Sequence, residues 1–461
     1  MYNLTIKDIV EQCKGKLAFG NPEMECISFS KDTRQINNGD VYIGIKGDNF
    51  DGNLFYEQAF SAGAKACVLQ NVEINEEIKN KYNGKAIVIV EDTVKALQQM
   101  AEFKRSKYNI PVVAVTGSVG KTSTRDMIAS VVSQKYNVLK TEGNLNNHIG
   151  LPLTILRLQN EDAMVVEMGM SNLGEIHVLS KIAKPSIAVI TNVGTAHIGN
   201  LGSRQNILLA KLEILDGMQE NGVAVINNDN DLLHEWYLQN KTYNVKCFGI
   251  ENESDLVAKN IVMNTEGISY DLQYGNTTEK VEVKVPSKPF VYNSLAAATV
   301  GKILDISADK IKEGIKNFEL TKNRMEIIKN SSITIINDCY NANFDSMKAS
   351  VESLAQMGGR KIAILGDMLE LGEYSKKIHS DIGEVVANNN IDMLITVGEE
   401  AKNIAKTAEE KGVDNSKIFT FNSNQEVKDF LKNTVKKDDT ILVKASNGMK
   451  FIEIVEFLKE F

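Results

Sequence analysis

Residues 114–127, AVTGSVGKTSTRDM, combine the residue types that hold and polarise a phosphate group. They follow the apolar run VVAV and precede a helical pattern, so a glycine-rich turn joins a strand to a helix N-terminus. Backbone N–H groups and the helix dipole favour an anion at such a point. Lys121 can reach the outer phosphates, and the Thr122 hydroxyl can bind a phosphate-bound Mg²⁺. The pattern predicts a nucleotide site formed by Thr116, Gly117, Ser118, Val119, Gly120, Lys121 and Thr122.

The glycine spacing departs from that of the commonest phosphate loop, which has a glycine five positions before Gly120. Val115 stands at that position, and the available glycine is Gly117. A purely structural turn is therefore an alternative interpretation. The strand, the Gly-Lys-Thr triplet and the helix occur together, and this combination favours the nucleotide site.

Further polar residues are expected at the same edge of the sheet. Glu167 ends the apolar run AMVVE, and His197 follows SIAVITN by five residues. The carboxyl ends of parallel strands share one edge, so we expect both residues near Thr122, with His197 as a candidate metal ligand. A surface acid and a structural histidine are the alternatives. Lys211 lies in the amphipathic segment ILLAKLEIL, where a lysine ordinarily belongs to the solvated face.

The elements that must position these residues predict an α/β protein of three domains, since 461 residues correspond to about three units of ~150 residues. Residues 1–100 read as a small α/β domain that ends in a helix from Thr93 to about Lys107. Residues 101–320 carry buried parallel strands and a period-two hairpin around Gly275 and Asn276. Residues 321–461 alternate strand and helix strictly, with amphipathic segments of ~10–15 residues, which predicts a doubly wound, Rossmann-like parallel sheet.

Composition excludes several classes of protein. The formal net charge of −8 disfavours a binder of nucleic acid or of anionic membranes. The N-terminus has no signal-peptide core and no run of 18 apolar residues occurs, so we expect a cytoplasmic protein without membrane insertion. We also expect a monomer. The five cysteines are widely spaced and indicate neither disulfides nor zinc, but small buried side chains.

Five segments resemble the central domain of the Mur ligases, the ATP-dependent enzymes that build the peptidoglycan stem peptide. They are TGSVGKTST, GNLNNHIGLP, VVEMG, TNVGTAHIGNLGS and AKLEI. The glycine spacing of the opening segment is the normal one in this family. KDTRQINNGDVYIGIKGDNFDGN resembles the family's N-terminal UDP-sugar domain, and NDCYNANFDSM with LGDMLELGEYSKKIH resembles its C-terminal domain. The resemblance thus covers nearly the whole chain.

The resemblance implies an ATP- and Mg²⁺-dependent amide-bond ligase that works through an acyl phosphate. YNAN and LGDMLELG resemble the members that add D-alanyl-D-alanine to a UDP-N-acetylmuramoyl-tripeptide, rather than a single amino acid. Both substrates are small molecules. Whether the tripeptide ends in lysine or diaminopimelate stays open, since that choice depends on a few pocket contacts.

The resemblance also implies roles for individual residues. The catalytic residues would be Lys121, Glu167, His197 and Lys211. The metal ligands would be Thr122, Glu167, His197 and Lys211, the last as a carbamate. Adenine and ribose contacts would fall on Asn293, Arg324 and Asp338. The UDP-substrate would contact Asp32, Arg34, Lys46, Asp51, Asn144 and Asn146, and the dipeptide would contact Tyr340, Asn341 and Asn343.

Four places depart from the family pattern. Pro289 and Phe290 replace a usual His-Asn pair, and Asn447 replaces the arginine of Lys-Gly-Ser-Arg. Asn53 replaces a histidine, and Asn337 replaces the first acid before YNAN. These changes remove polar contacts but leave the catalytic set intact.

Two other functions are weighed against the ligase. A related ligase such as a folylpolyglutamate synthase would share the central domain but not YNAN or the sugar-domain pattern. A nucleotide-driven switch specific for guanine would need Asn-Lys-x-Asp, but Asn240 and Lys241 are followed by Thr242 and Tyr243. The sequence favours the ligase.

Overall fold

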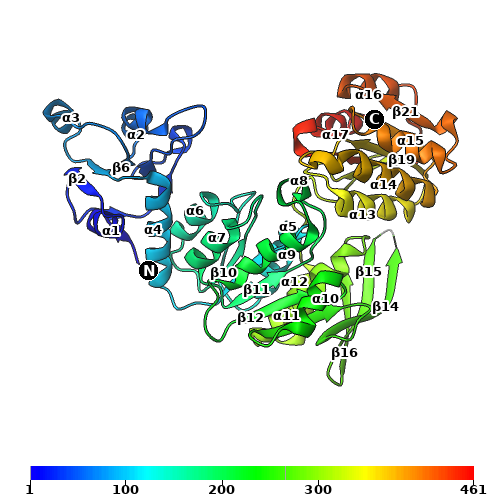
Figure 1. The fold of residues 1–461 in the computed structure, drawn as a ribbon, viewed down its shortest axis with the longest axis horizontal. Helices are drawn as coiled ribbons and strands as arrows, with labels where there is room; N and C mark the ends of the chain where they lie inside the picture. Colours follow the sequence, from blue (N-terminus) through cyan, green and yellow to red (C-terminus); the bar gives the residue numbers. More distant parts are fainter. Residues whose placement is uncertain (1, 265) are drawn as a thin grey trace.

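The chain folds into three α/β domains, each built around its own sheet. The structure is a computed structural model that describes residues 2–264 and 266–461. The N-terminal domain, drawn in blue, and the C-terminal domain, drawn in yellow to red, lie on either side of the central domain (Figure 1). The predicted α/β fold with a mostly parallel central sheet is confirmed. The boundaries at residues 100 and 320 stay predictions.

The N-terminal domain contains a five-stranded sheet. Its strands, in spatial order, are β2 (Lys16–Phe19), β7 (Ala86–Ile89), β6 (Ala66–Leu69), β5 (Val41–Ile43) and β4 (Phe29–Ser30). All neighbours are parallel except β2 and β7. A separate two-stranded sheet pairs β1 (Leu4–Thr5) with β3 (Glu25–Cys26). The helices are α1 (Ile6–Gln12), α2 (Tyr56–Ser61) and α3 (Glu76–Lys81).

Helix α4 (Thr93–Ser106) connects this domain to the next, as the sequence predicted. Its first turn is capped by Asp92, whose carboxylate accepts hydrogen bonds from the backbone N–H groups of Val94 and Lys95. One part of the helix packs on α1, and another part packs on α6 (Gly150–Leu156) and α7 (Glu175–Ala183) of the central domain. The helix therefore belongs to the interface between the two domains.

The central domain is built on a nine-stranded sheet. Its strands, in spatial order, are β16 (Thr277–Val283), β15 (Gly267–Tyr274), β14 (Leu256–Asn264), β13 (Asn244–Gly249), β12 (Val223–Asn227), β11 (Ile187–Ile190), β8 (Val112–Thr116), β10 (Ala163–Glu167) and β9 (Val138–Lys140). The strands from β9 to β14 run parallel. β8, β10 and β11 are buried along their whole length, as expected for continuous apolar runs between helical layers. The predicted hairpin is confirmed as β15 and β16, which pair antiparallel.

Helices cover the central sheet. Those not yet named are α5 (Lys121–Val132), α8 (Ile198–Leu201), α9 (Arg204–Leu212), α10 (Asp231–Gln239), α11 (Pro289–Ile303) and α12 (Ala308–Lys316). α5 packs against α11 and α12, and ten of its twelve residues are buried. This helix carries Lys121 and Thr122 at its first turn, so the core holds those residues in place.

The C-terminal domain is a six-stranded sheet flanked by helices. Its strands, in spatial order, are β17 (Glu326–Lys329), β18 (Thr334–Asn337), β22 (Asp439–Lys444), β19 (Arg360–Gly366), β20 (Met393–Val397) and β21 (Ile418–Phe421). Its helices are α13 (Phe344–Ala355), α14 (Ser375–Asn388), α15 (Lys402–Glu410), α16 (Asn424–Leu431) and α17 (Ile452–Leu458). The predicted doubly wound pattern is confirmed, because the strands from β18 to β22 pair in parallel.

Two details of that prediction were wrong. The domain begins with an antiparallel hairpin, because β17 precedes β18 and pairs with it. The turn between them is held by Asn330, whose side-chain oxygen accepts from the N–H groups of Ser332 and Ile333, a local turn that the strand-helix count overlooked. The helices α15, α16 and α17 have nine, eight and seven residues, shorter than expected.

The expectation about the cysteines is met. All five cysteines are free and buried. Among the described residues, no helix combines the length and apolar character needed to cross a membrane.

Candidate active site

The turn between β8 and α5 forms a glycine loop, residues 117–120. Gly120 precedes α5 with a φ of 80°, the left-handed region that favours glycine. A Cβ on Gly117 would overlap the Oγ1 atom of Thr191, which explains why the glycine falls at 117. The side-chain oxygen of Asn192 accepts hydrogen bonds from the N–H groups of Ser118 and Val119, at 3.1 and 2.9 Å. Neighbouring strand ends therefore hold the loop.

Lys121 folds back on this loop. Its Nζ donates to the carbonyl oxygen of Gly117 at 2.8 Å. Burial lowers the pKa of Lys121, Glu167 raises it, and the positive charge of Arg324 lowers it further. The amine thus lies beside the loop with only one neutral acceptor, a position from which it can turn to an anion.

Glu167 is not a surface acid, because only 2% of the residue is exposed. Its carboxylate accepts hydrogen bonds from Thr122 Oγ1 at 2.9 Å and from Asn146 Nδ2 at 2.7 Å. The predicted meeting of Thr122 and Glu167 at one sheet edge is therefore observed.

The buried Arg125 also contacts Glu167, at 3.3 Å, and pairs with Asp126 at 2.8 Å. Sequence reasoning missed this arginine. A charged Arg-Asp pair directly before the apolar residues of the same helix was the signal that could have found it.

His197 immediately precedes α8 and has a φ of 62° and a ψ of 23°. This left-handed conformation is uncommon for a residue other than glycine and marks a position held by its surroundings. Its Nδ1 is buried and lies 3.0 Å from the Glu370 carboxylate, without hydrogen-bond alignment. Burial, Lys121 and Lys211 lower the pKa of His197, and Glu370 only partly counters them. The neutral imidazole, the form that binds metal ions, is favoured.

Lys211 lies inside the protein rather than on the solvated face of α9. Only 1% of the residue is exposed. Burial and the positive charge of Lys121 lower the pKa of Lys211 well below its usual range. The expected solvated lysine is wrong because the apolar face of this short helix is wide enough to include position 211. Burial and the neighbouring cation therefore favour the neutral, nucleophilic form of the amine.

A cavity of about 420 Å³ brings many of the predicted residues together. It opens between the central and C-terminal domains. Its lining includes Ser118, Val119, Gly120, Lys121, Thr122, Asn144, Asn146, Glu167, His197, Asn293, Arg324, Asp338, Tyr340, Asn341 and Asn343. Most residues predicted to contact phosphate, metal and dipeptide thus face one space, whereas Thr116, Gly117 and Lys211 do not line it.

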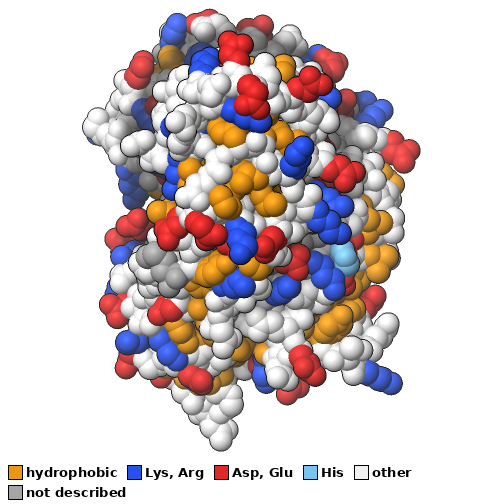
Figure 2. Space-filling model, turned by 90° about the vertical axis from the view of Figure 1, so that its left-hand side faces the viewer, with side chains coloured by type: hydrophobic (Ala, Val, Ile, Leu, Met, Phe, Trp, Pro, Cys, Tyr) orange, Lys and Arg blue, Asp and Glu red, His pale blue; other side chains and the backbone are white. Residues whose placement is uncertain are grey.

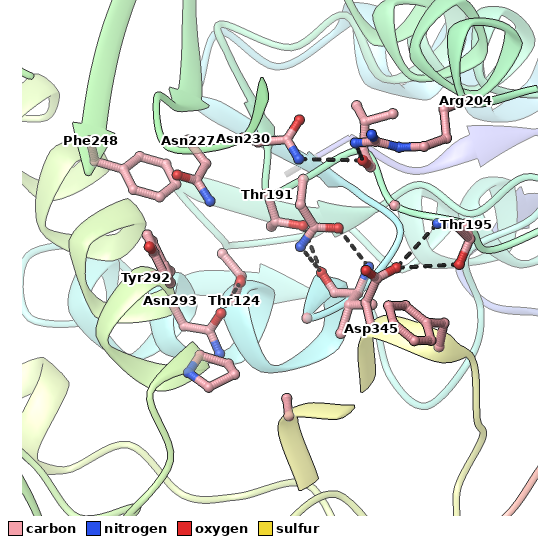
Figure 3. A pocket seen from close by; sticks show the side chains of 18 residues that line it. Thr124, Thr191, Thr195, Arg204, Asn227, Asn230, Phe248, Tyr292, Asn293 and Asp345 are labelled. Carbon is pink, nitrogen blue, oxygen red and sulfur yellow. Dashed lines mark hydrogen bonds between the residues drawn. The ribbon is translucent and has the colours of Figure 1, made fainter. Parts of the chain in front are cut away.

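A second cavity of about 430 Å³ adjoins the first and shares Gly120 and Asn293 with it. Figure 3 shows Phe248, Asn227 and Tyr292 along one side of it, and Thr195 with Asp345 on another. The Asp345 carboxylate accepts a hydrogen bond from the Thr195 N–H at 3.1 Å, so the C-terminal domain contributes to this wall. Sequence reasoning missed the aromatic wall, which comes from β13 and α11.

Asn293 lies where the two cavities meet. Its side-chain oxygen accepts from Thr124 Oγ1 at 3.0 Å, which ties α11 to α5. Pro289 is the first residue of α11, where its missing N–H costs nothing, and Phe290 is buried beside it. At these two positions Pro289 therefore begins the helix and Phe290 packs in the core, where the family usually has polar contacts.

The other departures also have structural explanations. Asn337 is buried, and its side-chain nitrogen donates to Asn323 Oδ1 and Glu326 Oε2, both at 2.9 Å. An acid there would face the Glu326 carboxylate. Asn53 donates to Asp51 at 2.7 Å and accepts from the Gln70 N–H at 2.9 Å. Asn447 lies in a single turn of 3₁₀ helix after β22.

The C-terminal residues at the cavity hold one another. The guanidinium of Arg324 lies 3.9 Å from the centre of the Tyr340 ring, a stacked cation–π contact. Asp338 pairs with the buried Lys444 and accepts from Ser350 Oγ at 2.6 Å. Asn343 caps α13 by accepting from the Ser346 N–H at 2.9 Å. The YNAN segment is thus fixed by a helix cap.

The N-terminal residues of the predicted site lie elsewhere. Asp32 binds Arg34 through two side-chain hydrogen bonds of 2.9 and 2.7 Å, and these lower the pKa of Asp32 to about 2. Lys46 and Asp51 face each other in an isolated antiparallel bridge. Neither pair lines the two cavities, so the structure does not bring them to the glycine loop.

The residues at the glycine loop suit Mg²⁺ bound through a phosphate. Among the described residues, no three His, Cys, Asp or Glu side chains form a cluster that could hold a metal ion alone. Thr122 and His197 face the cavity beside Glu167, and the carboxylate accepts hydrogen bonds from donors that a cation would replace. Mg²⁺ ordinarily takes one or two protein ligands and completes its shell with phosphate and water oxygens. The donor set fits that ion.

The fold and the site define an enzyme that binds a nucleoside polyphosphate at a glycine loop, with residues of a second domain lining the same cavity. Three family models match the chain: "Mur ligase family, catalytic domain" over residues 29–105, "Mur ligase middle domain" over 115–301, and "Mur ligase, glutamate ligase domain" over 323–447. The chain belongs to the Mur ligase family.

Similarity to individual proteins extends over the full chain. It is 38% identical to the UDP-N-acetylmuramoyl-tripeptide--D-alanyl-D-alanine ligase of Bacillus subtilis, over 100% of this chain and 99% of that protein. MurF from Acinetobacter baumannii superposes with a TM-score of 0.90 at 29% identity and full coverage of both chains. MurF from Thermotoga maritima, solved with ADP, has a TM-score of 0.83 at 29% identity, covering 94% and 97% of the two chains.

Proposed function

We propose that the protein is an ATP-dependent ligase that joins D-alanyl-D-alanine to the terminal carboxylate of UDP-N-acetylmuramoyl-tripeptide. The observation that carries the proposal is one cavity lined by both the glycine loop and the YNAN segment. Full-length similarity to ligases of this name supports it. The reaction yields an amide, ADP and phosphate.

The chemistry proceeds in two steps. A carboxylate is a poor acylating agent, because its leaving group would be an oxide. Its oxygen therefore attacks the γ-phosphorus of ATP, ADP leaves, and an acyl phosphate forms. The dipeptide amine then attacks the acyl carbon, loses a proton and expels phosphate. Both steps concentrate negative charge, so fixed cations supply most of the rate enhancement.

The glycine loop supplies the first of these charges. Lys121 would leave the Gly117 carbonyl and bind the β- and γ-phosphates, which offer a stronger, charged acceptor. Backbone N–H groups at the start of α5 would bind the same phosphates. When bound, Mg²⁺ neutralises phosphate charge and draws the two anions together. Thr122 and Glu167 would hold it.

Lys211 would act as a carbamate. Its neutral amine can add CO₂, which forms an N–C bond, releases a proton and converts a repulsive cation into an anionic ligand. The carbamate would balance Lys121 and bind a second Mg²⁺ with His197. Burial of an amine beside another cation supports this role, because that arrangement is unfavourable for an unmodified lysine.

The two cavities would bind different parts of the substrates. We assign the purine to the cavity of Figure 3, with Asn293 at its entrance, and the ribose to Asp338 and Arg324. The dipeptide would occupy the space at Tyr340, Asn341 and Asn343. The tripeptide would pass Asn144 and Asn146, while its UDP group reaches Asp32, Arg34, Lys46 and Asp51 in the N-terminal domain.

The partners are therefore small molecules. Lys and Arg side chains are interspersed with Asp and Glu on the face shown in Figure 2, unlike the single-sign stripe typical of proteins that bind nucleic acid. We propose that the protein acts as a cytoplasmic monomer, which light scattering of the purified enzyme would test.

Phosphate release provides the decisive experiment. We expect rapid release only when UDP-N-acetylmuramoyl-tripeptide and D-alanyl-D-alanine are both present with ATP and Mg²⁺. Each substrate alone is the control. Brisk hydrolysis that is indifferent to both would contradict the ligase.

A further inference from the structure

We propose that Glu370 of the C-terminal domain is a positioning residue for His197, so that docking of this domain orients the imidazole that binds metal. The inference rests on the proposed function. Glu370 lies in the segment LGDMLELG, which the reaction chemistry leaves without a role. We call residues 367–374 the docking loop.

The docking loop is held rigidly by its own domain. The fully buried His379 accepts a hydrogen bond from the Met368 N–H through Nε2, at 2.9 Å. Ser446 accepts from the Leu369 N–H at 2.9 Å, and the Asp367 carboxylate accepts from the Ala401 N–H at 2.7 Å. These bonds come from three different elements. The loop therefore moves with the C-terminal domain as one body.

The loop contacts α8 closely, directly after His197. In Figure 1, α8 lies where the central domain meets the C-terminal domain. A Cβ on Gly199 would lie 2.7 Å from the Glu370 carbonyl oxygen, so only glycine permits this approach. Tyr374 donates from its hydroxyl to the Gly202 carbonyl oxygen at 3.0 Å. Both ends of α8 are thereby fixed against the loop.

Two residues with left-handed backbones face each other across this contact. His197 has a φ of 62° and Glu370 a φ of 64°, and neither is glycine. Such conformations persist only where the surrounding structure enforces them. The strain falls on the two residues whose side chains meet, as expected for a contact with a function.

The charges around His197 favour the same role for Glu370. Lys121 and Lys211 act on the ring from the central domain, and Glu370 opposes them from the docking loop. Its Oε2 lies 3.0 Å from a buried Nδ1 that has no hydrogen-bond partner among the described residues. A carboxylate that accepts the Nδ1 proton fixes the tautomer with Nε2 free, the arrangement that metal-binding histidines use. A small rotation of either side chain completes the hydrogen bond.

The consequence is reciprocal coupling between metal binding and domain docking. If the docked C-terminal domain raises the affinity for the metal, bound metal must favour the docked state by the same factor. The amine-binding YNAN segment then reaches the cavity preferentially when the metal site is complete.

The first test measures the imidazole without metal or nucleotide. In protein labelled with ¹⁵N-histidine, we expect His197 to carry its proton on Nδ1, and Glu370→Gln to shift the population toward the Nε2–H tautomer. Glu373→Gln is the matched control, because Glu373 lies in the same loop and is exposed. An unchanged tautomer in Glu370→Gln would overturn the proposal.

The second test measures Mn²⁺ binding to enzyme saturated with ADP. Loss of a residue that orients a metal-binding histidine costs ~10–100-fold in affinity, so we expect at least a tenfold higher Kd for Glu370→Gln and no change for Glu373→Gln. Gly199→Val should give the same loss by pushing the docking loop away while the carboxylate stays. Wild-type affinity in both Glu370→Gln and Gly199→Val would contradict the inference.

These outcomes separate the inference from the ligase itself. If wild-type enzyme releases no phosphate with both substrates, the proposed function fails. If it does release phosphate, and Glu370→Gln keeps both the tautomer and the Mn²⁺ affinity of the wild type, only the positioning role fails.

Discussion

Two buried lysines show how differently the same side chain is used in two regions of this molecule. Lys104 of α4 and Lys211 of α9 are exposed by 0% and 1%, and both lie on helices where a lysine usually faces solvent. Lys104 donates at 2.7 Å to the carbonyl oxygen of Leu156, the last residue of α6. There its charge meets the negative end of a helix dipole.

Lys211 has a different environment. Burial and then the cation Lys121 lower the pKa of Lys211 well below the usual range, whereas burial lowers the pKa of Lys104 only to about 8. A buried cation that meets a carbonyl end joins two domains. A buried amine that meets another cation is unfavourable for folding and is retained where chemistry needs a neutral nucleophile.

The largest loss of activity should follow removal of Lys121, the cation that acts on Lys211. We expect Lys121→Ala to reduce turnover about 1,000-fold, or about 4 kcal/mol, because the amine stabilises developing phosphoryl charge. Binding of the UDP-substrate, measured by calorimetry, should hardly change. Near-normal turnover would mean that the glycine loop is not the catalytic nucleotide site.

The second largest loss of activity should follow removal of Lys211 itself. Lys211→Ala should lose about 100-fold in activity, as expected for a lost metal ligand. Acetate or formate should restore part of the rate by supplying the missing carboxylate, and wild-type enzyme depleted of CO₂ should regain activity with bicarbonate. Steady-state assays check each point. A Lys211→Ala enzyme with wild-type turnover would return this lysine to a structural role.

A third buried lysine, Lys444, extends the comparison because it has a full counter-charge in Asp338. Lys444→Met leaves that carboxylate buried beside Ser350, so we expect the free energy of unfolding to fall by about 3 kcal/mol. Denaturant titration measures it. The double variant Lys444→Met/Asp338→Asn should recover part of the loss, and a double variant no better than the single one would argue against the ion pair.

The smallest effect concerns Lys104. Its folded-state pKa, about 8, lies below the ordinary 10.5, so between these values the unfolded chain binds more protons and stability rises with pH. Lys104→Met should remove the part of the rise in stability with pH that comes from this lysine. At neutral pH the lost hydrogen bond to Leu156 and the relieved charge should offset each other to within about 1 kcal/mol, and turnover should be unchanged.

Thermal unfolding of wild type and Lys104→Met from pH 7 to 10 provides the measurement. Relative to the wild type, the variant should be most stable near pH 7, and its relative stability should fall as the pH rises toward 10. An identical slope in both proteins would mean that Lys104 is not desolvated in solution.

Much of the nucleotide site could be predicted from sequence because its residues are local. Strand, glycine turn and helix are specified within residues 112–132, and the hydrophobic periodicity around them needs no distant contact. Glu167 and His197 followed from one further rule, that parallel strands end at a common edge. Period-two alternation likewise predicted the central hairpin, and the alternation of strand and helix predicted the doubly wound sheet of the last domain.

What sequence could not supply depends on contacts between segments far apart in the chain. Whether a lysine on an amphipathic helix is solvated or enclosed is decided by what packs over it, so Lys104 and Lys211 could not be distinguished from surface residues. Arg125 reaches Glu167 only because α5 lies beside β10, and Glu370 reaches His197 only because two domains dock. A site formed by neighbouring residues can be predicted from the sequence. The burial and pairing of a charged side chain arise only when tertiary packing removes water from around it.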